Sequence, residues 1–511
     1  MNDKPLASSV GRRSIAAQAF LSGRAALSRS FRLHRPRGAF CQGGWCQQCK
    51  VKLADGAVVL ACQQACGDAD GAALQPRTWF MSLIGPIVER QPPWFYESHF
   101  LRPAVLRQFY LNALRRLSGA LPLPERCPTP GTPWRELDCD VLVVGGGLAG
   151  LRAAKEFRAA NRSVIVVDAS RRFGKEESAL SQERTSARDA GCGVLLDTVC
   201  VGLYESPRRA LCVDDAGSMR IAHRELVVAT GAYDRLILFP NNDLPGIVGV
   251  RAFEILLAQS AVPPRYKIGI YGEVLEVARA LEALNKLGRR AAWIAGPSRS
   301  AESNDDIRWH PETYISRADG TNRIGSVTLS RVGRLECDML VLAFSQPGYE
   351  LQMQRQAKLV LDGRPSQLTP EVSFIDLLVV GEAAGDVDLD AKTALAHAEG
   401  RTKEWLHSRK NLPRPRCAEH NSFPSAPAEA LVCPCEDVRV RDVRSAIAEG
   451  YNDIESIKRR TGAATGPCQG KLCHANLMDC VVELGVDARL PTQRPLVRPI
   501  TFAQFAGASE Q

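Results

Sequence analysis

The stretch that decides the fold is CDVLVVGGGLAGLRAAKEFRAANRSVIVVDAS, which runs from Cys139 to Ser170. A short apolar run, Val141–Val144, leads directly into a turn with G-x-G-x-x-G spacing. A helix-like segment, a second β-branched run and an acid follow in that order. Strand, glycine turn, helix, strand and acid together are typical of a βαβ unit that binds a dinucleotide.

Each glycine of this turn has a mechanical reason. Gly145 allows the tight turn out of the strand, Gly147 lets the backbone approach a pyrophosphate, and Gly150 lets the helix pack on the sheet. The helix-like segment is Leu151–Ala160, with Leu148 and Ala149 in the turn before it, and the first N–H groups of a helix have no partner within it. We therefore expect the start of this helix to face the phosphates of a dinucleotide.

The acid after the second strand, Asp168, is placed to accept hydrogen bonds from a ribose. An acid rather than a base here favours an unphosphorylated ribose, as in FAD or NAD. Farther along, the chain should return to the same sheet through the strand that ends in Ala229, Thr230 and Gly231. The small residues of that strand allow its backbone to pass close to the bound dinucleotide.

A second βαβ pattern begins at Lys267, with a helix expected over Val274–Leu287 and a strand over Ala291–Ala295. Its turn keeps one glycine, Gly272, and Glu273 would direct a carboxylate toward any pyrophosphate. Repulsion between the two anions argues against binding here. We predict an inherited dinucleotide fold that has lost its ligand.

The composition is that of a soluble globular chain, with 45% hydrophobic and 24% charged residues among 511. A net charge of +9 is mild for this length and predicts no nucleic-acid binding. No apolar run approaches the ~18 residues of a transmembrane helix. The N-terminal segment has no acid between Asp3 and Asp55, and a shortage of acids is also typical of mitochondrial presequences. We interpret Ser14–Gly23 as a domain helix instead and expect a cytoplasmic protein.

Seventeen cysteines need an explanation, and eight of them fall into two sets with ligand-like spacing. The first set is Cys41-x4-Cys46-x2-Cys49, followed by Cys62, with Cys66 as the alternative fourth member. Three thiolates on one loop and a fourth from a strand end resemble a plant-type [2Fe–2S] site. Zinc is the competing metal, because four cysteines also suit a tetrahedral structural site.

The second set is Cys433-Pro434-Cys435 followed by Cys468-x4-Cys473. The segment between the two pairs predicts two short amphipathic helices joined at Gly450. Four sulfurs would meet at helix ends, which lower thiolate pKa values and favour an anionic cluster. Zinc again remains the alternative. We expect the adjacent His474 at the surface and the single cysteines in the core, namely Cys192, Cys200, Cys212 and Cys337.

Three passages carry a resemblance to a known family. They are SFRLHRPRGAFCQGGWCQQCKV (Ser30–Val51), GAYDRLILFPNNDLPGI (Gly231–Ile247) and VCPCEDV…GPCQGKLC (Val432–Cys473). The first two resemble the α subunits of heterotetrameric sarcosine oxidase and their relatives in hydrogen cyanide synthase and the octopine and nopaline dehydrogenases. The third is similar to the [2Fe–2S] module of bacterioferritin-associated ferredoxin (BFD), which the same family contains. The second passage departs from the family at Asp234, where glutamate is usual.

The resemblance implies one subunit of a flavin-dependent amine or imino-acid dehydrogenase. A partner subunit built like D-amino-acid oxidase, with its own FAD, would oxidise the substrate, and this chain would pass electrons onward one at a time. The implied cofactors are FAD in the first domain, with NAD as the alternative, two [2Fe–2S] clusters, and an FMN at a subunit interface as a further option. By likeness to two-dinucleotide flavoproteins, Gly381 and Glu382 would contact the flavin side chain.

Two other functions stay open at this point: a self-sufficient NAD(P)H-dependent flavin and iron–sulfur reductase, and a catalytically degenerate scaffold. No general base, nucleophile or substrate-binding arginine stands out in the sequence, which fits a relay subunit. The expected fold is α/β, with two dinucleotide-binding domains, an N-terminal ferredoxin-like [2Fe–2S] domain and a C-terminal helical BFD-like domain. The expected boundaries are 10–75 (ferredoxin-like), 76–136 (linker with a helix), 137–254 (FAD-binding, first part), 255–365 (degenerate NAD-like insert), 366–412 (FAD-binding, return) and 425–485 (BFD-like).

Overall fold

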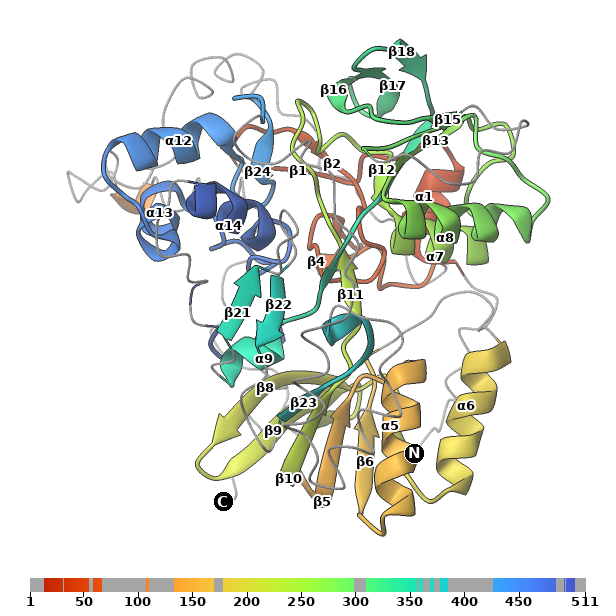
Figure 1. The fold of residues 1–511 in the computed structure, drawn as a ribbon, viewed down its shortest axis with the longest axis vertical. Helices are drawn as coiled ribbons and strands as arrows, with labels where there is room; N and C mark the ends of the chain where they lie inside the picture. Colours follow the sequence, from red (N-terminus) through yellow and green to blue (C-terminus); the bar gives the residue numbers. More distant parts are fainter. Residues whose placement is uncertain are drawn as a thin grey trace.

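A computed structural model of the chain describes residues 13–30, 32–54, 58–66, 107–109, 133–169, 178–297, 309–355, 358–361, 368–371, 377–384, 426–483, 491 and 493–500. Most of the linker at 76–136 and the helix expected after Lys392 lie outside these residues. Two α/β domains form the body of the molecule, and the N-terminal and C-terminal segments pack beside the second of them (Figure 1). No helix within the described ranges is long and apolar enough to cross a membrane.

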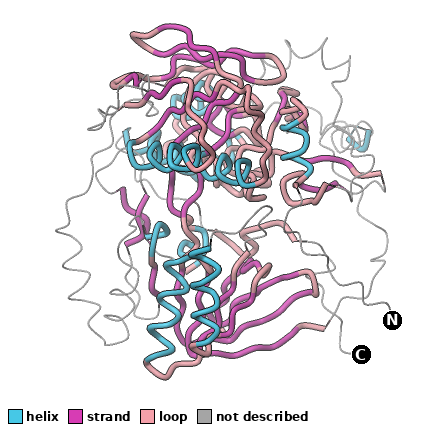
Figure 2. Tube along the Cα trace, turned by 90° about the vertical axis from the view of Figure 1, so that its right-hand side faces the viewer, coloured by secondary structure: helices cyan, strands magenta, loops and turns pink. Residues whose placement is uncertain are grey.

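The first α/β domain is built around the stretch that the sequence singled out. Its apolar strand is the centre of a seven-stranded sheet of order β7-β6-β5-β10-β9-β8, with β23 paired to β10. Two helices lie side by side against one face of this sheet (Figures 1 and 2). The elements are β5 (Arg135–Val144), α5 (Leu148–Ala159), β6 (Val164–Val167), α6 (Ser178–Asp189), β7 (Gly193–Leu195), β8 (Val199–Glu205), β9 (Arg208–Asp214), β10 (Gly217–Val228), β23 (Leu377–Val379) and the 3-10 turn η1 (Gly381–Ala384).

The core of this domain explains why these residues form these elements. Val141 and Val143 of β5 are completely buried, as are Leu151 and Phe157 of α5, which lie on the apolar stripe of the helix. A parallel strand covered on its faces is expected to read as a continuous β-branched run, as β5 does. The predicted return strand is the end of β10, which pairs in parallel with β5.

The second α/β domain has a five-stranded parallel sheet of order β12-β19-β13-β14-β15. The predicted strand–helix–strand unit is confirmed as β13, α8 and β14, and a small antiparallel sheet of three strands adjoins it. The elements are β12 (Ile247–Gly249), α7 (Val250–Ala258), β13 (Ile268–Gly272), α8 (Val274–Asn285), β14 (Trp293–Ala295), β15 (Trp309–His310), β16 (Ile315–Gly320), β17 (Ile324–Leu329), β18 (Gly333–Glu336) and β19 (Met339–Ala343).

Two strand connections join the α/β domains. Strand β11 leaves the first domain and pairs antiparallel with β20, which returns from the second. Asp234, the departure from the family pattern, lies at the end of β11, and its carboxylate accepts hydrogen bonds from the N–H groups of Arg251 and Ala252 at the start of α7. The connecting elements are β11 (Ala232–Asp234), β20 (Ser345–Pro347), α9 (Glu350–Gln354), β21 (Lys358–Leu361) and β22 (Leu368–Glu371).

The N-terminal and C-terminal segments each form a small unit. The predicted N-terminal helix is confirmed, and its N-cap Ser14 accepts a hydrogen bond from the N–H of Ala17. Two helices on either side of Gly450 are confirmed as well. The elements are α1 (Ile15–Leu21), β1 (Ser28–Arg29), β2 (Pro36–Arg37), β3 (Lys50–Lys52), β4 (Val58–Leu60), β24 (Leu431–Cys433), β25 (Val438–Arg439), α12 (Val440–Ala448), α13 (Ile454–Thr461) and α14 (His474–Glu483).

Candidate functional site

The glycine turn after β5 has the geometry that a dinucleotide site requires. Gly145 has a φ of +115°, and a β-carbon there would lie 2.1 Å from the carbonyl oxygen of Ala229. A β-carbon on Gly150 would lie 2.0 Å from the carbonyl oxygen of Gly145. A β-carbon on Gly147, by contrast, would meet no atom within 4 Å. The outer glycines are therefore needed for close packing, and the middle one keeps the space in front of α5 open.

The N-terminus of α5 faces that open space. Gly147 is the N-cap of the helix, with no side chain over the helix end, and Leu148 is 39% exposed. The first N–H groups of a helix have no partner inside it, and the helix dipole adds partial positive charge at the same end. The backbone at Leu148 and Ala149 can therefore receive an anionic group such as a pyrophosphate.

The acid at the end of β6 lies beside the glycine turn, as predicted, but it has a neighbour that the sequence did not reveal. A β-carbon on Gly146 would lie 2.9 Å from Oδ2 of Asp168. The Nη2 atom of Arg184, on α6, donates a hydrogen bond of 2.7 Å to that same oxygen. Both side chains are largely buried. The acidic group that would bind a ribose therefore forms an ion pair with an arginine.

The end of β10 closes another side of the site. The hydroxyl of Thr230 donates to the carbonyl oxygen of Gly348, and the N–H of Gly348 donates to Gly231, both at 2.9 Å. Gly231 has a φ of +69°, which explains why glycine occupies this position. Ala229 and these two residues thus lie together with the first glycine turn, as the sequence predicts.

Glu382 also reaches this region, because its Oε2 lies 3.8 Å from where a β-carbon on Gly231 would be. Two arginines from the second domain bind it: Arg251 at 2.8 Å and Arg279 at 3.1 Å. Burial opposes the ionisation of Glu382, but the two guanidinium groups hold its pKa below the ordinary value. Gly381, with a φ of +65°, starts the 3-10 turn that positions it. Both arginines were missed at the sequence level.

The first cysteine set converges in the fold. Cys41, Cys46, Cys49 and Cys62 are each about 1% exposed, whereas Cys66 is exposed. The side chain of Cys41 is within hydrogen-bonding reach of Cys46 and Cys62, and Cys62 is also within reach of Cys49. Burial favours Cys62 over Cys66 as the fourth member of the set.

Backbone donors surround the sulfur of Cys41. The N–H groups of Gly43 and Cys46 lie 3.4 and 3.3 Å from its Sγ. Burial opposes the ionisation of Cys41, but the neighbouring thiols and these N–H groups hold its pKa well below the ordinary value. The loop is therefore built to stabilise a thiolate, the form that binds metals.

The second cysteine set converges in the same way. Cys433 is within hydrogen-bonding reach of Cys435 and Cys473, and Cys435 is within reach of Cys468. Hydrogen bonds from the thiols of Cys435 and Cys473 lower the pKa of Cys433 well below its ordinary value. A β-carbon on Gly466 would lie 2.4 Å from Cβ of Cys435, so the two segments approach closely. The four single cysteines that were assigned to the core are all buried.

The two cysteine sets lie next to each other. Cys41, Cys46 and Cys468 belong to one continuous buried core, and Cys435 packs against it. Buried ion pairs hold the segments together: Arg37 contacts both Asp243 and Asp437, and Asp437 accepts hydrogen bonds from the N–H groups of Arg32 and Leu33. Because breaking a buried ion pair costs several kcal/mol, these contacts tie the segment before the first set to the loop after Cys435.

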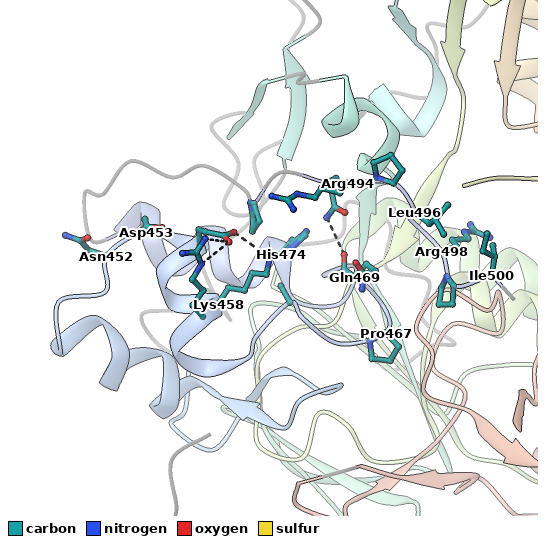
Figure 3. A pocket seen from close by; sticks show the side chains of 17 residues that line it. Asn452, Asp453, Lys458, Pro467, Gln469, His474, Arg494, Leu496, Arg498 and Ile500 are labelled. Atoms are coloured by element: carbon teal, nitrogen blue, oxygen red, sulfur yellow. Dashed lines mark hydrogen bonds and ion pairs between the residues drawn. The ribbon is translucent and has the colours of Figure 1, made fainter. Parts of the chain in front are cut away.

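His474 corrects a sequence expectation. We expected it at the surface, but only 1% of it is exposed, and it packs at 6.3 Å from the ring of Tyr349. Burial lowers its pKa to about 3. The residue lines a cavity of about 1320 Å³ beside the second cysteine set, which the cations Lys458, Arg494 and Arg498 also line (Figure 3).

Three protein families match stretches of the chain. They are a 2Fe-2S iron-sulfur cluster binding domain over residues 2–75, an FAD binding domain over 140–183 and the sarcosine oxidase A3 domain over 428–508. The first two contain the first cysteine set and the glycine turn, and the third contains the second cysteine set. The α/β fold with flavin-binding and iron–sulfur domains is thereby confirmed.

Individual proteins match along most of the chain. The sarcosine oxidase α subunit of Rhizobium meliloti is 26% identical over 97% of this chain and 56% of its own length. The opine oxidase A subunit of Agrobacterium tumefaciens is 25% identical over 72% of this chain and 91% of its own length. The hydrogen cyanide synthase subunit HcnB of Pseudomonas aeruginosa is 22% identical over 65% of this chain and 90% of its own length. The chain spans about half the length of the sarcosine oxidase α subunits that it matches.

Among solved structures, L-proline dehydrogenase from P. horikoshii superposes with a TM-score of 0.65 over 97% of this chain and 94% of its own, at 18% identity. This similarity confirms the fold. The sequence matches, the domain matches and the arrangement of glycine turn and cysteine sets agree with one another. The chain is therefore similar, along most of its length, to the sarcosine oxidase α subunits, the opine oxidase A subunits and the HcnB subunits of hydrogen cyanide synthase.

Proposed function

We propose that the chain is an electron-relay subunit of an amine or imino-acid oxidoreductase complex, with FAD in the first α/β domain and a [2Fe–2S] cluster at each cysteine set. A partner flavoprotein subunit, built like D-amino-acid oxidase and holding its own FAD, would oxidise the C–N bond of the substrate. The observation that carries the proposal is the convergence of two four-cysteine sets that adjoin each other through Cys41, Cys46, Cys435 and Cys468.

The first domain suits FAD. The open N-terminus of α5 has room for the pyrophosphate, and the outer glycines bring the strand and helix backbones together behind it. Asp168, which lies beside the glycine turn and pairs with Arg184, would bind the ribose of FAD; NAD is the alternative dinucleotide. When bound, a flavin accepts two electrons and can release them singly. The role of the chain's own residues is to bind its phosphates and to hold it beside the second domain.

The spacing of the first cysteine set favours [2Fe–2S] over zinc. Three of its cysteines lie on one loop in x4 and x2 spacing, as in plant-type ferredoxins, and the set lies within the match to a 2Fe-2S iron-sulfur cluster binding domain over residues 2–75. In each set neighbouring thiols lie within hydrogen-bonding reach of one another, Cys46–Cys41–Cys62–Cys49 in the first and Cys473–Cys433–Cys435–Cys468 in the second. Four thiolates also suit a tetrahedral zinc site, which is the alternative that metal analysis tests.

The cavity beside the second cysteine set supports an additional flavin site. Its four cations, Lys458, Arg459, Arg494 and Arg498, outnumber its two acids, Asp453 and Glu455, so the lining would attract a phosphate group, and the cavity adjoins the loop of Cys468. We assign the FMN that the family resemblance implies to this cavity, where a partner subunit would cover it.

The test is anaerobic reduction of the native complex. The chain is co-purified with its partner subunits, and candidate amines are added while the flavin and iron–sulfur absorption bands are recorded. We expect one amine or imino acid to bleach both sets of bands, and NADH to bleach neither. Bleaching by NADH would instead support a self-sufficient reductase. A colourless protein without iron or flavin would support a scaffold, and either result would contradict the relay.

A further inference from the structure

A single side chain joins the two cysteine sets. Gln48 lies between Cys46 and Cys49 in the first loop, and only 8% of it is exposed. Its Nε2 atom donates a hydrogen bond of 3.2 Å to Sγ of Cys435, a member of the second set. The same nitrogen donates one of 3.1 Å to the carbonyl oxygen of Cys46. Both protons of the amide are thus directed at the two sites.

The backbone of Gln48 is held in place independently of this contact. Its carbonyl oxygen accepts a hydrogen bond of 2.7 Å from the hydroxyl of Ser28 on β1. The side chain adjoins a small cavity of about 30 Å³, which Pro434 and Leu472 also line. The cavity leaves space for a side chain of similar size to be exchanged without crowding the core.

On the basis of the proposed function, we infer that Gln48 couples the two clusters and sets the reduction potential of the second. Hydrogen bonds to the ligand sulfurs are one determinant of the potential of an iron–sulfur cluster. A donated N–H stabilises the more negative, reduced state and therefore raises the potential. Gln48 is in this sense a positioning residue, since it acts through the sulfur of Cys435.

The same contact supplies a hydrogen-bonded connection between the sites. From Cys46 it runs along the backbone to the carbonyl oxygen, across the amide nitrogen of Gln48, and on to the sulfur of Cys435. The step is a one-electron exchange in which one cluster is oxidised as the other is reduced. No bond forms or breaks, and the amide keeps both of its protons.

The test replaces the amide by an apolar side chain of similar length, in Gln48→Met. The full chain is reduced stepwise under anaerobic conditions, and the cluster signals are followed by electron paramagnetic resonance. A Cys468→Ala variant identifies the signal of the second cluster. We expect the one-electron equilibrium constant for reduction of that cluster to fall about tenfold, which corresponds to a potential lower by about 59 mV.

A matched control exists at the first site. Gln63 places its Nε2 atom 3.7 Å from Sγ of Cys62, so Gln63→Met removes a similar amide from the other cluster. This control should leave the potential of the second cluster unchanged. Gln48→Asn, which withdraws the amide from Cys435, should reproduce the effect of Gln48→Met.

Three results separate the possible failures. Wild-type protein without iron and sulfide would contradict the proposed function itself. Both clusters present in Gln48→Met, with the potential of the second unchanged, would overturn the role of Gln48 alone. Loss of the second cluster in both Gln48 variants would also overturn it, because a structural role would then account for the contact.

Discussion

The two α/β domains follow the same chain path and differ where a dinucleotide would bind. In the first, α5 starts after Gly147, where an added β-carbon would meet nothing within 4 Å. In the second, α8 starts after Glu273, which places a carboxylate side chain at the corresponding N-cap. The comparison teaches that the chain path alone does not make a site; the space and charge at the helix start do.

The next positions differ as well. Three residues after the N-cap, the first domain has Gly150, and the second has Glu276, which pairs with Arg251 at 3.4 Å. After the second strand the first domain has Asp168, whereas the second has Gly296, where a β-carbon would lie 2.4 Å from the carbonyl oxygen of Gly272. The second domain thus lacks both the anion-binding turn and the ribose acid.

The largest effect on flavin binding is expected from giving the first domain the N-cap of the second. Gly147→Glu extends its side chain into open space, so the protein should fold. Its carboxylate would fill the space that the pyrophosphate needs and would repel that anion. We expect the flavin content of the purified protein to fall at least about tenfold, the loss that ~1.4 kcal/mol of binding free energy produces.

Gly325→Ala is the matched control for this variant. It lies on β17, and its β-carbon would meet the carbonyl oxygen of Asp319 at an ordinary 3.8 Å. The control should keep its flavin. Full flavin content in Gly147→Glu would break the comparison between the two domains.

The next prediction concerns Asp234, which accepts hydrogen bonds at the start of α7 and should make the stability of the protein depend on pH. Burial raises the pKa of Asp234 to about 7, although Arg251 and the N–H groups of the helix favour its ionised form. A raised pKa means that Asp234 stabilises the fold fully below about pH 4, and that this contribution is lost as the pH rises through 7. Asp234→Asn cannot ionise. Between pH 4 and pH 8, we expect its free energy of unfolding to gain about 4 kcal/mol relative to wild type.

Urea unfolding of both proteins across this range measures the difference. Parallel pH profiles for the two proteins would show that Asp234 is ionised in the fold at all these values. The carboxylate would then be an ordinary charged cap on α7.

The ion pair at the ribose acid should cost somewhat less to remove. Arg184→Leu leaves the largely buried carboxylate of Asp168 without its arginine, and breaking a buried pair in this way costs about 3 kcal/mol. Arg188→Leu on the exposed side of the same helix is the matched control, and it should change stability little. Equal unfolding free energies for the two variants would show that the pair contributes nothing to the first domain.

The smallest effect is expected in the first turn of α8. Leu275 is 74% exposed at the helix start that lacks the glycine turn. Leu275→Ser should leave flavin content unchanged and alter the free energy of unfolding by less than about 0.5 kcal/mol. If Leu275→Ser lowers the amount of nucleotide bound to the protein, the start of α8 contacts a ligand, and the second domain has a binding site.

Local patterns made much of the fold predictable from the sequence. The apolar run of β5, the glycine spacing and the N-cap Ser14 act over a few residues, so their elements could be placed. The spacing within each cysteine set likewise indicated which sulfurs would meet. These features are encoded by neighbours along the chain.

The contacts that were missed join distant segments. Arg184 has no motif that marks it as the partner of Asp168, and Glu382 binds arginines 131 and 103 residues away. Gln48 and Cys435 are separated by 387 residues. His474 is polar and follows a cysteine, which suggested exposure, but the packing of Tyr349 encloses it. Such pairings depend on tertiary packing, which periodicity and spacing do not encode.

The most direct test of the relay is the quantity of iron, acid-labile sulfide and zinc in anaerobically purified protein. We predict about four iron atoms and about four sulfides per chain, the content of two [2Fe–2S] clusters. About two zinc ions per chain with no labile sulfide would correspond to two structural tetrahedral sites. That result would contradict an electron-carrying role for this subunit.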